Sequence, residues 1–127
     1  MFVVQDTIDE SIDWPVVVET PVAGGKSRKY EFTGTFRRLS DDEKKAIEKE
    51  VEEMQAQAEK AEWIDGYVER TMKIMTNWRD VVDPKKNTIE YTRENLKKAV
   101  MSPSGMAIIN GIYRAMNQIE SGVKAKN

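Results

Sequence analysis

The stretch Ile74–Leu96, IMTNWRDVVDPKKNTIEYTRENL, decides how the rest of the chain is arranged. It predicts that one helix ends at Trp78, that a loop follows, and that another helix starts after Thr92, a suitable N-cap. Asp83-Pro84 stops any helix, because proline lacks an N–H group and disfavours the α conformation of the preceding residue. We expect four side chains to anchor the loop in a core: Trp78, Val82, Ile89 and Tyr91.

Residues 1–38 are mainly of β type. Runs of β-branched and aromatic residues predict three strands, at 2–4, 16–22 and 28–37, with Trp14-Pro15 at a strand entrance. Gly24-Gly25 marks a turn, so the second and third of these strands should pair as an antiparallel hairpin. Gly34 inside the last strand predicts a bulge or bend.

Residues 39–121 are mainly helical in pattern. Ser40 and Glu43 have the spacing of a capping box, which starts the first helix. This helix carries a narrow apolar stripe: Ile47, Val51, Met54, Ala58 and Ala61. We interpret it as a surface helix that packs one edge on the body, and a self-association seam is the alternative.

Between Ala61 and Gly66 we expect a break or kink, since glycine disfavours a helix interior. The next helix, to Trp78, is apolar over a wide face and should be central. Helices at 93–101 and 103–120 follow, the last with Ser102 as N-cap and Pro103 at its first position. Gly122 ends it, and residues 122–127 form a frayed tail. The predicted fold is α+β in one domain, 1–127: a small N-terminal antiparallel sheet of about three strands, then about four helices.

Composition restricts the chemistry. The 127 residues include 20 basic and 22 acidic ones but no cysteine or histidine, which removes disulfides, thiolate nucleophiles and the commonest metal ligand and general base. Apolar runs are far shorter than the roughly 20 residues that span a bilayer, and the first residues do not have the pattern of a signal peptide. We therefore expect a soluble intracellular protein that is not an enzyme and has no cofactor.

Two patterns resemble binding motifs only superficially. Gly25-Lys26-Ser27 matches the end of a phosphate-binding loop, but position 20 is Thr20 instead of glycine and a strand, not a helix, should follow. The acids of residues 41–62 alternate with lysines, as on a solvated helix face, so we expect no metal site.

A basic strand raises the possibility of single-stranded nucleic-acid binding, because basic residues interleaved with aromatics can hold a strand by charge and stacking. The residues concerned are Lys26, Arg28, Lys29, Arg37 and Arg38, with Tyr30, Phe32 and Phe36 between them. Alternation places the aromatic residues on the face that a core needs, so we do not favour this function.

The order of these features resembles the tail assembly chaperones of long-tailed bacteriophages. The matching parts are Trp78 with the valines after it, the Asp83-led turn, and Ile89-x-Tyr91-Thr92 with Glu94-Asn95-Leu96. The similarity extends to Phe32–Ser40, FTGTFRRLS, and to Ser102-Pro103, and it covers roughly two thirds of the chain. None of these motifs is catalytic.

The resemblance implies a non-enzymatic protein of the host cytoplasm that binds the tape-measure protein, helps recruit tail-tube subunits, and is not retained in the mature virion. Such a protein needs an apolar groove for an amphipathic helix. Our candidate contact residues are Met72, Met75, Ile108, Ile112 and Met116. A structural virion component, such as a tail-completion or connector protein, is the main alternative, and homo-oligomerisation stays open.

Overall fold

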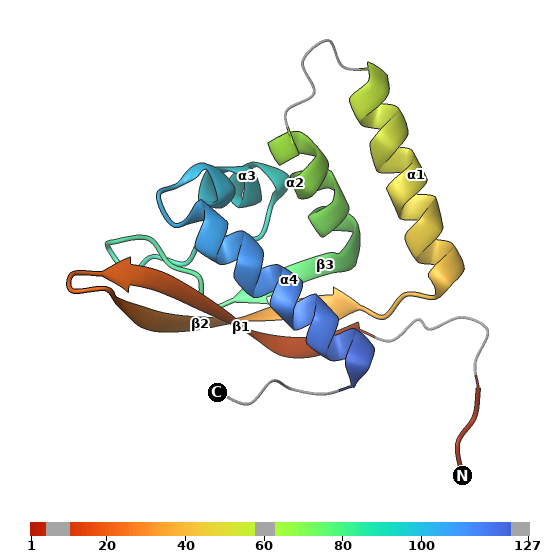
Figure 1. The fold of residues 1–127 in the computed structure, drawn as a ribbon, viewed down its shortest axis with the longest axis horizontal. Helices are drawn as coiled ribbons and strands as arrows, with labels where there is room; N and C mark the ends of the chain where they lie inside the picture. Colours follow the sequence, from red (N-terminus) through yellow and green to blue (C-terminus); the bar gives the residue numbers. More distant parts are fainter. Residues whose placement is uncertain (5–10, 58–62, 123–127) are drawn as a thin grey trace.

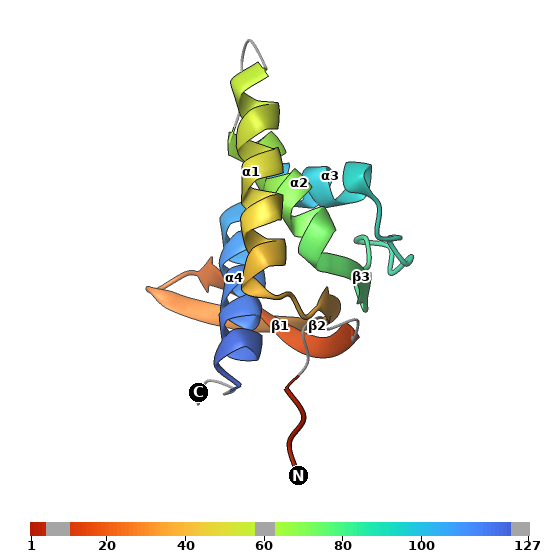
Figure 2. The ribbon, with the colours of Figure 1, turned by 90° about the vertical axis from the view of Figure 1, so that its right-hand side faces the viewer.

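The structure, a computed structural model, describes residues 1–4, 11–57 and 63–122. In these residues one antiparallel sheet is formed by β1 (Ser11–Val22), β2 (Lys26–Arg37) and β3 (Met75–Arg79), in that order. The helices are α1 (Asp41–Gln57), α2 (Trp63–Ile74), α3 (Arg93–Met101) and α4 (Gly105–Ser121). All of them lie on one side of the sheet (Figure 1, Figure 2). The predicted α+β fold, with three strands and four helices, is confirmed.

The hairpin is the longest feature of the sheet. β1 and β2 pair over their whole lengths, from Ser11 opposite Arg37 to Val22 opposite Lys26. Gly24 and Gly25 form the turn with φ values of 84° and 72°, a left-handed conformation that glycine adopts without steric cost. The hairpin was predicted, but β1 begins earlier, so that Pro15 lies inside the strand. Because β1 is an edge strand, the missing N–H of proline is tolerated there.

The third strand is not the predicted one. Residues 2–4 form no strand and are exposed, whereas β3 comes from the region that we predicted as the end of a helix. A register shift beside Thr35 and Phe36 leaves one extra residue in β3, so Met75 lies opposite Phe36 and Trp78 lies opposite Gly34. Gly34 itself pairs in register with Trp14 and with Trp78, so the β-bulge lies in β3, next to the predicted position and not at it.

An N-cap hydrogen bond and a close backbone contact determine where the last two helices begin. α3 has the predicted bounds, and Thr92 Oγ1 caps it by accepting from the Asn95 amide at 3.1 Å. α4 begins at Gly105, two residues later than predicted, because Ser102 and Pro103 form a turn instead of its first residues. A Cβ atom at position 105 would lie 1.8 Å from the Val100 carbonyl oxygen, so only glycine allows this turn.

Some predictions fall on parts that the structure does not describe. Ala58 and Ala61, at the end of the apolar stripe, lie outside the described residues, as does part of the predicted break before Gly66. Gly66 itself is buried within α2. Gly122 ends α4 in a left-handed conformation as predicted, while residues 123–127 of the predicted tail lie outside the described residues.

The loop after β3 is anchored by aromatic side chains. Trp78 donates from Nε1 to the Ile89 carbonyl at 2.8 Å, and the Tyr91 hydroxyl donates to the Met75 carbonyl at 2.7 Å. The rings of Trp78 and Tyr91 meet edge to face with centroids 5.0 Å apart. The prediction that Val82 belongs to this anchor is wrong, because its side chain is 46 % exposed.

The main core lies between the sheet and α2, α3 and α4. α4 crosses β1 so closely that a Cβ atom on Gly111 would lie 2.5 Å from the Val17 carbonyl oxygen. The buried residues of this main core are Val16, Val18, Phe32, Phe36, Tyr67, Val68, Met75, Trp78, Leu96, Val100, Ile109, Ile112 and Ala115.

Candidate functional site

A groove of about 470 Å³ lies where α1, α2 and α4 meet the connection from β2 to α1. Its apolar lining consists of Phe36, Leu39, Ile47, Ile74, Tyr113, Met116 and Ile119. Its charged residues are Arg37, Arg38, Lys44, Glu48, Arg70 and Glu120. A lining of apolar residues together with charged ones suits an amphipathic helix. We call this site the α1 groove.

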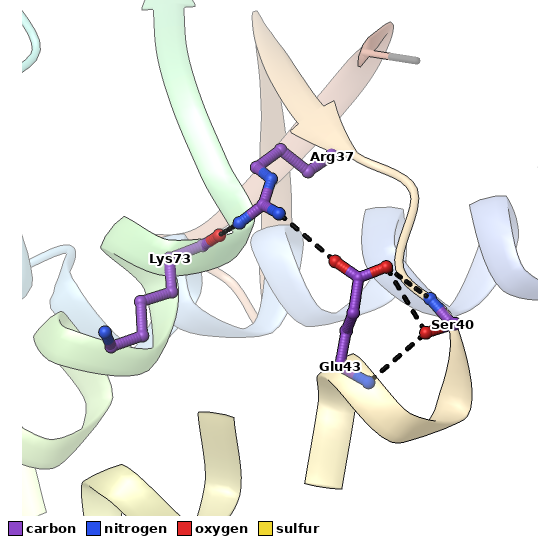
Figure 3. A network of polar contacts seen from close by, with 4 residues as sticks. All are labelled: Arg37, Ser40, Glu43 and Lys73. Carbon is purple, nitrogen blue, oxygen red and sulfur yellow. Dashed lines mark hydrogen bonds and ion pairs between the residues drawn. The ribbon is translucent and has the colours of Figure 1, made fainter. Parts of the chain in front are cut away.

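The entrance to α1 is fixed by a polar network at one end of the groove (Figure 3). The Glu43 amide donates to Ser40 Oγ at 3.2 Å, and the Ser40 amide donates back to Glu43 Oε1 at 3.3 Å, which is the predicted capping box. The other Glu43 oxygen accepts from Arg37 at 3.2 Å, and Arg37 also donates to the Lys73 carbonyl near the end of α2. One arginine therefore joins β2, α1 and α2.

Ion pairs attach the rest of α1 to the body. Glu48 receives two hydrogen bonds from Arg70 of α2, at 2.6 and 3.1 Å. Glu50 pairs with Lys73 of α2 at 2.8 Å, and Lys44 pairs with Glu120 of α4 at 2.5 Å. The hydrogen bonding that Arg70 donates to Glu48 is the main cause that raises the pKa of the Arg70 guanidinium.

Apolar burial also contributes to this attachment. Val51 is the fully buried side chain of α1, and among the described residues α1 contributes no member to the main core. Burying one valine is worth roughly 1.5–3 kcal/mol, and a partly exposed ion pair about 0.2–1 kcal/mol. Burial of Val51 therefore contributes at least as much to the attachment of α1 as any one of its ion pairs.

A buried tyrosine packs against the lining of the groove. Tyr67 packs edge to face against the groove residue Tyr113, with ring centroids 5.3 Å apart. Burial raises the pKa of Tyr67 and of Tyr91 well above the ordinary value. The nearby Thr71 hydroxyl acts on the pKa of Tyr67 in the opposite direction to burial, which is the larger effect. The buried Tyr67 hydroxyl forms no hydrogen bond within the described residues. Both phenols therefore stay neutral, and the Tyr67 ring packs against the groove residue Tyr113.

The five predicted contact residues are not brought together. Met116 lines the α1 groove, but Met72 and Ile108 are half-buried against the main core elsewhere. Met75 and Ile112 have no exposed surface at all, so they are core residues in this structure. The groove residues that we did not predict include Leu39 and Arg70, for which the sequence gives no local signal. Ile47 of the predicted stripe and Met116 of the predicted contact residues are the groove residues that the sequence did indicate.

The basic strand does not form a stacking surface. Phe32 and Phe36 are buried in the main core, and of the three aromatic residues considered only Tyr30 is exposed, at 52 %. In the described part of the chain, no group of three or more acidic, histidine or cysteine side chains is placed to hold a metal ion. The groove is therefore the best-supported site.

The chain matches no protein-family model, and comparisons with curated proteins and with solved structures give no significant match. Across residues 1–4, 11–57 and 63–122, the helices lack the length and apolar character needed to cross a membrane. Function must therefore be inferred from the residues and their geometry.

Proposed function

We propose that the protein is a non-enzymatic tail assembly chaperone of a long-tailed phage or prophage. It acts in the host cytoplasm and is absent from the mature virion. Its α1 groove binds an apolar helical segment of the tape-measure protein and keeps this long protein soluble, while the bound complex recruits tail-tube subunits.

The observation that carries the proposal is the α1 groove itself. It has seven apolar and six charged lining residues, and one of its walls is α1, which forms ion pairs with α2 and α4. A helix-binding groove explains these features together, because partner helices dock through apolar anchors while peripheral charges set their orientation. The resemblance of Phe32–Ser40 and of residues 78–96 to the chaperone family supports the same function.

Co-expression with the tape-measure protein tests the proposal. We expect a soluble complex with the wild-type protein, and an insoluble tape-measure protein when it is expressed alone. Met116→Gln should reduce recovery of the complex, because Met116 lines the groove. Met106→Gln is the matched control, since Met106 lies on the same helix with 60 % of its surface exposed and does not line the groove.

Two results would contradict the proposal. If the tape-measure protein remains insoluble in the presence of the wild-type chain, the proposed chaperone function is refuted. Stoichiometric amounts of the chain in purified particles would favour a structural virion component instead.

A further inference from the structure

We infer that the outer edge of β2 next to the hairpin turn is a second binding surface, which accepts an acidic extended segment of another protein as an added β-strand. We call this surface, residues 26–31, the open β2 edge. The hairpin turn lies at the opposite end of the molecule from α1 (Figure 1), so the inference goes beyond the proposed function of the groove. Strand addition uses main-chain hydrogen bonds for affinity and side chains for specificity.

The edge is open because β2 is longer than its neighbour β3. β1 pairs with the whole of β2, whereas β3 pairs only with residues 33–36. Within the described part of the chain, no backbone hydrogen bond from a turn or loop reaches residues 26–31, and all of these residues are exposed. An unpaired edge is a template for another strand.

The backbone groups of alternate residues point out of this edge. Pro21 of β1 lies opposite Ser27, and because proline has no N–H group, this is a position without β1–β2 hydrogen bonds. The Thr35 carbonyl, in the same alternation as Ser27, accepts from a threonine hydroxyl of β3 at 3.4 Å and so points away from β1. Ser27, Lys29 and Glu31 therefore direct their N–H and C=O groups out of the open β2 edge.

The outer edge of β1 is closed to a partner strand by comparison. Its outward positions include Pro15 and Pro21, which have no N–H group to donate. α4 covers part of it, because a Cβ atom on Gly111 would lie 2.5 Å from the Val17 carbonyl oxygen. Of the two long strands, β2 is therefore the one that a further strand can join.

The side chains of the open β2 edge are basic. Lys26, Arg28 and Lys29 lie between the turn and Tyr30 with no acid among them. Lys29 pairs with Glu19 of β1 at 3.9 Å, whereas the other two cations form no ion pair within the described residues. The Tyr30 side chain, 52 % exposed, adds an aromatic surface beside them.

This charge selects the partner. A second copy that paired through the same edge would place cations opposite cations, which is destabilising. Acids at alternate positions of a partner strand would instead lie beside Lys26 and Arg28, which point to the same side of β2. The occupant is therefore an extended acidic segment of a different protein.

A short fluorescein-labelled peptide in which glutamate and valine alternate is the probe, with fluorescence anisotropy as the readout. The full-length wild type should bind it. Lys26→Glu/Arg28→Glu should weaken binding at least about tenfold, because acids then lie opposite acids. The control Lys45→Glu/Lys49→Glu makes the same charge change at exposed positions of α1 and should leave the affinity unchanged. No binding by the wild type, or equal binding by all three proteins, would overturn the inference.

Lys29→Pro and Lys29→Thr distinguish strand addition from attraction between charges alone. Both remove the same charge, but only proline removes the outward N–H group. Proline fits an outward position of this hairpin, as Pro21 shows on β1. Lys29→Pro should bind the peptide about tenfold more weakly than Lys29→Thr. Equal affinities, with circular dichroism showing that both variants are folded, would overturn the inference.

Hydrogen exchange on the wild type gives a test without substitution. The amides of Ser27, Lys29 and Glu31 should exchange at least about tenfold more slowly when the peptide is bound, whereas those of Arg28 and Tyr30, which face β1, should change little. No added protection at the three outward amides would overturn the inference. So would tighter binding of single-stranded oligothymidylate than of the peptide, which would make the surface a nucleic-acid site.

The groove variant separates this inference from the proposed function. Met116→Gln should bind the peptide like the wild type, because Met116 lines the groove and not the open β2 edge. Peptide binding without tape-measure binding would refute the chaperone proposal alone. Tape-measure binding without peptide binding would refute the strand addition alone.

Discussion

The buried Tyr67 and the partly buried Tyr91 provide a matched test of how the structure is stabilised. The Tyr91 hydroxyl donates a 2.7 Å hydrogen bond to the Met75 carbonyl, which fastens the loop to β3. The Tyr67 hydroxyl is buried without a hydrogen bond in the described part of the chain. Replacing each by phenylalanine removes one oxygen and keeps the ring, so the two variants differ chiefly in the hydrogen bond that is lost.

The expected effects have different signs. Tyr91→Phe loses a hydrogen bond and leaves a partly buried carbonyl without this donor, which should lower the free energy of unfolding by about 1–2 kcal/mol. Tyr67→Phe removes a polar atom that was desolvated without compensation, so its free energy of unfolding should stay the same or rise by up to about 1 kcal/mol.

Urea denaturation followed by tryptophan fluorescence measures both changes by linear extrapolation. In a thermal scan, a loss of about 1 kcal/mol corresponds to roughly 3–5 °C for a chain of this size. Equal destabilisation by the two substitutions would refute the reasoning, because it would show that the Tyr67 hydroxyl makes a contribution that the structure does not contain.

Three further predictions follow from the same packing. Burial raises the pKa of Tyr67 and Tyr91 in the folded state, so their contribution to the free energy of unfolding is present below the unfolded tyrosine pKa of about 10 and is lost as the pH rises above it. Between pH 9 and pH 11, the free energy of unfolding should therefore fall less in a Tyr67→Phe/Tyr91→Phe variant than in the wild type. Gly111→Ala should destabilise the fold by about 1–3 kcal/mol in urea, because a Cβ atom there meets the Val17 backbone, whereas exposed Asn110→Ala on the same helix should not. Ser40→Ala should cost about 1 kcal/mol through loss of the α1 cap, and no change in the urea midpoint would contradict that role.

Local signals predicted most of the fold. Turn glycines at 24 and 25, the capping box at Ser40 and the N-cap at Thr92 each act over a few residues, and each is found as expected. The error at Met75–Arg79 has a specific cause. Met75 and Trp78 are three residues apart, a helical spacing, but both reach the core because the bulge opposite Thr35 and Phe36 absorbs one residue. A pairing irregularity of this kind leaves no trace in the strand's own sequence.

The groove was harder to predict than the fold. Its contacts join residues distant in sequence, such as Arg70 with Glu48 and Lys44 with Glu120. Apolar residues on one broad helix face could not be divided between core and groove from sequence, because Ile112 and Met116 lie on the same side of α4 and differ only in what covers them. Met116 was therefore the only predicted contact residue that lines the groove.

The central claim is that the α1 groove binds the tape-measure protein, and the dissociation constant of that complex tests it most directly. Isothermal titration calorimetry should be carried out on wild type, Met116→Gln and Met106→Gln, with circular dichroism to verify that each is folded. We predict that Met116→Gln weakens binding about tenfold or more and that Met106→Gln leaves it unchanged. Equal affinities of all three folded proteins would contradict the claim and place the partner elsewhere on the surface.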